Sequence, residues 1–112
     1  MKTTSPLQNV LAALTAEIAR QDALHPAGFP ATRDGLRLGL AYAQDELNEA
    51  EEAHRAERCK CPLPACDHAR WTRTRIEALQ AAAVLLRLVR SIETQEQSDR
   101  LVGAEESEPH FG

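Results

Sequence analysis

Two groups of residues have types and spacing that could do chemistry, and the first is a run of carboxylates. In "AQDELNEAEEAHRAE", Asp45, Glu49 and Glu52 stand at helical positions i, i+4 and i+7, while Glu46 and Glu49 are three apart. Because no basic residue interrupts them, these like charges repel each other on a helix unless a cation is present. Carboxylate oxygens are ligands that Mg²⁺ prefers. The run therefore predicts a Mg²⁺ site, and a solvated helix face is the alternative.

A second stripe with acid, amide and basic groups follows later in the chain, at Arg73, Glu77, Gln80, Val84, Arg87 and Ser91. Glu77 could complete the first stripe, or it could form a capping box with Thr74 and satisfy backbone donors. Arg87 and Arg90 lie in an apolar stretch, where an unpaired cation is costly to bury. We therefore expect them to reach solvent or to contact an anion such as phosphate.

The second group with possible chemistry is a cluster of three cysteines and one histidine in "RCKCPLPACDHARW". Four metal-binding side chains fall in the pattern C-x-C-x4-C-x-H: Cys59, Cys61, Cys66 and His68. A set of four such ligands fills a tetrahedral zinc site and leaves no position for water, so we expect a structural zinc rather than a catalytic one. The alternatives are unligated thiols in a polar loop, or three cysteines completed by Asp67, His54 or water.

The elements that must position these groups are helices. Ser5 followed by Pro6 is typical of a helix start, and helical periods predict helices at about 6–24, 34–58 and 72–95. The stretch "HPAGFPATRDG" separates the first two helices, with Thr32 or Asp34 as the next cap. We expect one domain over residues 1–96 and a flexible acidic tail over 97–112.

The composition indicates the fold class. Aromatic residues make up only 4% of the chain, which favours helices over a sheet and predicts an all-α fold, a small antiparallel bundle of three helices. One apolar stripe on the second helix is expected to face the core: Leu36, Leu40, Ala43, Leu47 and Ala50. The third helix is apolar nearly all round over residues 78–89, which predicts a central helix and a homo-oligomer, a dimer or larger.

The charge of the chain limits its partners. A net charge of −4 and a pI near 5.5 argue against nucleic acid, although the arginines of "HARWTRTR" keep a DNA-binding regulator as a minor alternative. No apolar run reaches the length of a membrane span, and crowded thiols suit a reducing compartment. We therefore expect a cytoplasmic protein with no membrane partner.

The motifs resemble those of a known family, the MazG-like all-α nucleoside triphosphate pyrophosphohydrolases. The segment 45–49, "DELNE", is similar to their E-E-x-x-E motif, and "EALQ", which ends at Gln80, stands where their E-x-x-D comes. The chain looks like the small phage and actinobacterial members over about residues 10–93, with the Cys/His loop inserted. This resemblance implies a bacterial or phage-infected host cell.

The resemblance also implies an activity and its residues. The family hydrolyses nucleoside or deoxynucleoside triphosphates to the monophosphate and pyrophosphate with Mg²⁺. Carried over by position, Glu46 and Glu49 are metal ligands, Asp45 is a ligand or the base that orients water, and Glu77 is a further ligand. Gln80 stands in a ligand position where the family has aspartate, and a neutral amide binds Mg²⁺ more weakly.

Two further residues are expected at the substrate. From their places on the helices, we expect Arg87 to contact phosphate and Gln21 to lie near the nucleotide. The competing interpretation is a non-catalytic helical interaction module of the same fold, in which zinc holds two helices at a fixed angle so that they present a surface to a protein partner or to another copy of the chain.

Overall fold

The computed structural model describes residues 4–57 and 71–107, and these residues form three helices. The helices are α1 (Pro6–Leu24), α2 (Arg33–Ala56) and α3 (Thr72–Ser107). The all-α class predicted from the composition is therefore confirmed. The four residues predicted to bind zinc lie outside the described residues: Cys59, Cys61, Cys66 and His68.

The predicted helix starts are confirmed by their caps. The Ser5 hydroxyl accepts a hydrogen bond from the backbone N–H of Gln8, and the Gln8 side chain accepts one from the N–H of Ser5, so the first helix begins with a capping box. Thr32 caps α2 by accepting from the N–H of Gly35. Both caps satisfy backbone donors that have no partner inside the helix.

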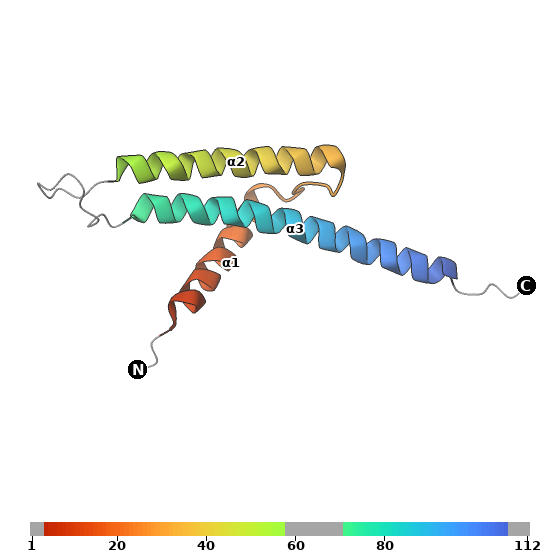
Figure 1. Cartoon of the computed structure of the whole chain (residues 1–112). Helices are drawn as coiled ribbons and strands as arrows, with labels where there is room; N and C mark the ends of the chain where they lie inside the picture. The colour runs from red at the N-terminus through yellow and green to blue at the C-terminus, as the bar shows by residue number, and fades with distance from the viewer. Residues whose placement is uncertain (1–3, 58–70, 108–112) are drawn as a thin grey trace, which may run out of the picture.

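The helices α2 and α3 lie side by side and antiparallel. The N-terminal end of α1 points away from α3, and its C-terminal end meets the middle of α3 (Figure 1). The third helix continues to Ser107, well beyond the end near Gln95 that the sequence predicts, so most of the predicted tail belongs to the helix. Its polar second half extends past the start of α2 (Figure 1). Glutamate, glutamine and arginine there are good helix formers, which explains why the helix continues without an apolar stripe.

The face of α2 that packs on α3 is made of small residues rather than leucines. The buried residues of α2 are all small: Gly35, which lies against Pro30, and Gly39, Ala43, Ala50 and Ala53. The prediction that the leucine stripe faces the core is wrong for two of its members, since Leu40 is 57% exposed and Leu47 is 46% exposed. A Cβ atom at Gly39 would overlap Cδ2 of Leu88. The two helices therefore approach so closely that an alanine at this position would require the Leu88 side chain to shift.

Side chains from α3 hold α1 in place. The guanidinium of Arg87, only 4% exposed, donates to the Asp22 carboxylate at 3.0 Å and to the backbone oxygen of His25 at 2.8 Å. Arg90 donates to both oxygens of the same carboxylate. These hydrogen bonds, from Arg90 above all, lower the pKa of Asp22.

The start of α3 is capped from α2. Glu57, the residue that follows α2, accepts from the backbone N–H groups of Arg73 and Thr74 and from the Thr74 hydroxyl. The imidazole of His54 stacks on the Trp71 indole, with ring centroids 5.0 Å apart and an angle of 15° between the ring planes. These contacts hold the end of α2 against the start of α3 at the two described borders of the Cys/His segment.

Several large apolar side chains remain at the surface. Among them, Leu40 and Leu47 of α2 and Leu85 of α3, the last 44% exposed, border a groove of about 210 Å³ between the two helices. Within the described ranges, each helix is too short or too polar to cross a lipid bilayer.

Candidate functional site

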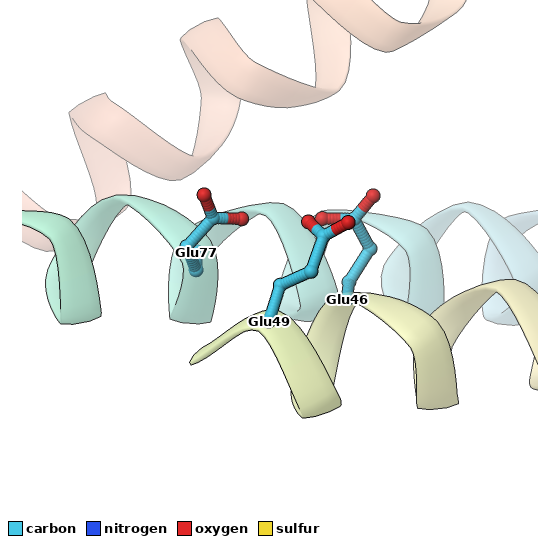
Figure 2. A group of neighbouring side chains, drawn as sticks. All are labelled: Glu46, Glu49 and Glu77. Carbon is cyan, nitrogen blue, oxygen red and sulfur yellow. The ribbon is translucent and has the colours of Figure 1, made fainter. Parts of the chain in front are cut away.

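Three carboxylates converge where α2 packs on α3. Glu46 and Glu49 project from α2, and Glu77 projects toward them from α3 (Figure 2). One oxygen from each carboxylate lies within 4.8 Å of the others. We call these three residues the carboxylate cluster. The i, i+3 spacing places the first two side by side on one helix, and the antiparallel pairing of the helices supplies the third.

The three negatively charged carboxylates of the cluster repel each other. Burial, and then the negative charges of Glu49 and Glu77, raise the pKa of the Glu46 carboxyl. The pKa of Glu77 is also raised, chiefly by burial and by its hydrogen bond and charge interaction with Glu49, although Arg73 acts in the opposite direction. Carboxyls with raised pKa values are partly desolvated and lack a full counter-charge. A bound cation would supply that charge.

Gln80 lies next to the cluster, one turn after Glu77. When its amide nitrogen faces the carboxylates, it donates to Glu77 Oε2 and to Glu46 Oε2, each at 2.9 Å. When its amide oxygen faces them instead, that oxygen lies among acceptors only, an orientation that a cation between them would favour. Gln80 can therefore face the cluster with its amide nitrogen when no metal ion is bound and with its amide oxygen when one is bound.

The first helix brings a fourth carboxylate close to the cluster. Glu17 of α1 accepts from the guanidinium of Arg20, and this bond lowers the pKa of Glu17. The charges of Glu17 and Arg20 both act on Glu46 across the interface between helices. Sequence reasoning missed this pair, although the i, i+3 spacing of an acid and a base on one helix was a signal.

A cavity of about 380 Å³ opens beside Glu46. Its walls come from the end of α1, the connection to α2, and the middle of α2 and α3, and they include Gln21, Phe29, Tyr42 and Arg87. Sequence reasoning singled out Gln21 and Arg87 but missed the two aromatic rings, because their meeting depends on how the connection folds over α2. The volume lies in the range of small-molecule sites.

The structure brings together some of the predicted residues and leaves others apart. Glu46, Glu49, Glu77 and Gln80 meet, whereas Asp45 is exposed and is not part of the carboxylate cluster. Glu52 is exposed as well. In a helix, Glu46 and Glu49 can share the face toward α3, and Asp45 is turned about 100° away from Glu46.

Two predicted roles change in the structure. The capping box that would use Glu77 does not form, because Glu57 accepts from the first backbone donors of α3 and Glu77 faces Glu49. Arg87 lines the cavity, but Asp22 and the His25 carbonyl engage its guanidinium, so it is a buried link between helices as well as a cavity wall.

The donor set fits a hard divalent cation. Three carboxylates and one amide supply oxygen ligands only. Oxygen ligands suit Mg²⁺ and Mn²⁺ better than they suit softer metals. Because Glu49 is exposed, the cluster is open on one side to water and to a further anionic ligand. An open position of this kind is needed for a catalytic metal.

The chain matches no family model, no curated protein and no solved structure.

Proposed function

We infer that this chain is a Mg²⁺-dependent pyrophosphohydrolase of nucleoside or deoxynucleoside triphosphates, of the MazG-like type. The observation that carries this proposal is the position of the carboxylate cluster beside a cavity of nucleotide-compatible size, with Glu46 shared by both. A triphosphate with its phosphates at the cluster and its nucleoside in the cavity would satisfy the two features at once.

The residues would divide the work according to their exposure. Glu46, Glu77 and the Gln80 amide oxygen are half-buried and would hold the cation between the helices. The cation would polarise the phosphate oxygens and lower the pKa of a bound water. Glu49, the exposed member, would accept the proton of the attacking water. Asp45 lies outside the cluster, and its proposed part is limited to the local negative field.

Product analysis tests this proposal. Purified protein with Mg²⁺ and a panel of nucleoside triphosphates is expected to release pyrophosphate and the monophosphate. Glu49→Gln removes the proton acceptor and is expected to lower kcat at least on the order of 100-fold. Glu51→Gln is a matched control, since Glu51 is exposed on the same helix but outside the cluster. A wild-type protein that turns over no triphosphate would contradict the proposal.

The second candidate function is a non-catalytic helical interaction module, and the exposed leucines along α2 and α3 favour it. Such a module has no need of a carboxylate cluster beside a cavity. In the assay above, the module would show no turnover with any nucleotide, and Glu49→Gln would leave nucleotide binding unchanged.

We also infer a structural zinc at Cys59, Cys61, Cys66 and His68. The spacing of these residues supports it. The contacts that hold the two borders of the segment together also support it, since Glu57 at the end of α2 caps the start of α3. Protein purified without added metal is expected to contain one zinc per chain, and a chelator is expected to lower both the melting temperature and the Mg²⁺-dependent activity. Unchanged melting after confirmed zinc removal would rule out a structural role.

A further inference from the structure

The cavity beside the cluster combines a ring surface with one buried polar group. The rings of Phe29 and Tyr42 lie 5.7 Å apart between centroids, with 53° between their planes. The guanidinium of Arg87 stands over the Phe29 ring, 5.8 Å from its centroid, and fixes that side chain from one side. Aromatic walls of this kind suit a flat heteroaromatic group.

Gln21 is the buried polar group in the cavity wall, and its orientation is determined by its surroundings. It is 6% exposed, and its amide nitrogen donates to the backbone oxygen of Gln80 at 3.1 Å and to Glu17 Oε1 at 3.2 Å. A flip of the amide would place its oxygen against these two acceptors. The orientation of the Gln21 amide is therefore fixed, because the Glu17 carboxylate and the Gln80 backbone oxygen can only accept hydrogen bonds. The amide oxygen is the atom left over to accept one.

That oxygen lacks a partner. Gln21 Oε1 is buried and accepts no hydrogen bond from any described residue. A buried acceptor without a donor costs free energy, and a ligand that brings an N–H group to it recovers that cost. A ligand that brings a carbonyl oxygen to the same point adds repulsion between two acceptors.

We propose that this cavity binds the base of the nucleotide against Phe29 and Tyr42, and that Gln21 Oε1 accepts a hydrogen bond from an amino group on the edge of the base. Gln21 is then a specificity-determining residue: it favours an amino-bearing base over its keto counterpart. This inference rests on the proposed function for the identity of the ligand as a nucleotide, whereas the hydrogen-bond preference comes from the fixed amide.

Paired substrates test the preference directly. The two pairs are cytidine with uridine triphosphate and adenosine with inosine triphosphate. In each pair a keto group replaces the amino group, and the adjacent ring nitrogen changes from an acceptor to an N–H. In at least one pair, kcat/KM is expected to be on the order of tenfold higher for the amino member, mainly through KM. Equal values in both pairs, or a preference for the keto members, would overturn the proposal.

A variant assigns the preference to Gln21. Gln21→Met keeps the length of the side chain and removes the acceptor, so the ratio within the discriminating pair is expected to fall to near one. Gln44→Met is the matched control, because Gln44 is an exposed glutamine on α2 that bonds to Asn48 outside this cavity, and it is expected to leave the ratio unchanged. A ratio that Gln21→Met does not alter would refute the role of Gln21.

Binding of nucleosides without Mg²⁺ separates this inference from the proposed function. Ligand-observed NMR with cytidine, uridine, adenosine and inosine needs neither phosphate nor catalysis, and it also serves if Gln21→Met fails to fold. Selective binding of the amino members to a protein that hydrolyses no triphosphate would support the base site and refute the enzyme. Turnover of triphosphates with no discrimination and no nucleoside binding would refute the base site and leave the enzyme standing.

Discussion

At the scale of single residues, the carboxylate cluster is a set of like charges that the fold forces together. Glu46 and Glu77 have raised pKa values because burial and the neighbouring carboxylates disfavour their ionised forms. A group whose pKa is higher in the folded state than in the unfolded state stabilises the fold at low pH. That contribution is lost as the pH rises from the ordinary value of 4.5 through the raised value.

We therefore predict that Mg²⁺ stabilises the protein more at about pH 7 than at about pH 5, since the cation replaces the protons that the cluster loses. Without metal, Glu49→Gln is expected to raise the melting temperature relative to wild type at the higher pH, because it removes repulsion from the cluster. Thermal unfolding with and without Mg²⁺ measures both effects. Glu51→Gln is the control, and a melting temperature that Mg²⁺ raises equally at both pH values would contradict a cation site at the cluster.

At the scale of elements, the site depends on how closely α2 and α3 approach. Small residues line the buried face of α2, and Gly39 lies against Leu88, which is 4% exposed. Glu46 stands about two turns after Gly39 on the same helix, so the separation of the helices at the glycine also sets the position of the cluster. At the far end, the Glu57 carboxylate holds the start of α3, which fixes the register of Glu77 against α2.

We predict that Gly39→Ala destabilises the fold by about 1–3 kcal/mol, because the added methyl group overlaps the buried Leu88 side chain, which must shift or push the helices apart. Gly103→Ala is the matched control: it is also inside a helix, but a Cβ there meets nothing within 4 Å. Its better helix propensity is expected to stabilise by about 0.5–1 kcal/mol. Chemical denaturation measures both, and equal shifts of the same sign would contradict the close approach.

At the scale of the whole molecule, three helices leave much apolar surface uncovered. Leu40, Leu47 and Leu85 border one groove, and each exposes more than two fifths of its surface. Contiguous apolar surface on a small helical protein is typical of an interface. We propose that a second copy of the chain covers this face, since helices with matching apolar stripes can pack symmetrically.

This proposal predicts a solution mass of at least twice the 12.3 kDa of one chain, measured by light scattering after size exclusion. Leu47→Lys with Leu85→Glu is expected to yield monomers, because charges in an apolar interface are costly to bury. Leu101→Glu is the control: it is 69% exposed but lies about 24 Å further along α3 than Leu85, and it is expected to keep the wild-type mass. A monomeric wild-type protein would contradict the proposal.

Much of the local structure was predictable from the sequence. Ser5 with Pro6 predicted where α1 begins, and Thr32, one of the two caps expected for the second helix, is the one that caps α2, because caps act on the nearest backbone donors. The period of the apolar residues predicted three helices. The composition, with few aromatic residues, predicted the all-α class. The spacing of Glu46 and Glu49 predicted that they share a helix face, and this depends on the helical repeat alone.

The end of α3 was not predictable in the same way. A polar sequence with high helix propensity can continue a helix without any apolar stripe, so the helix extends to Ser107 although burial gives no signal for it. The leucines of α2 were a misleading signal as well, because their regular spacing predicted a buried stripe that the structure does not bury in full. Close approach at Gly39 selects the small residues for the interface and leaves Leu40 and Leu47 at its edge.

By itself, then, the sequence determined what is local in this protein: the helices, their caps, and which acids share a helix face. Only the tertiary structure decided which of those acids meet across helices. It selected Glu77 as the partner of Glu49, brought Glu17 toward Glu46, and enclosed Gln21 with Phe29 and Tyr42 in one cavity. Such contacts depend on the rotation and separation of the helices. Individual close contacts, such as that of Gly39 with Leu88, set these two quantities, and a periodic sequence pattern does not encode them.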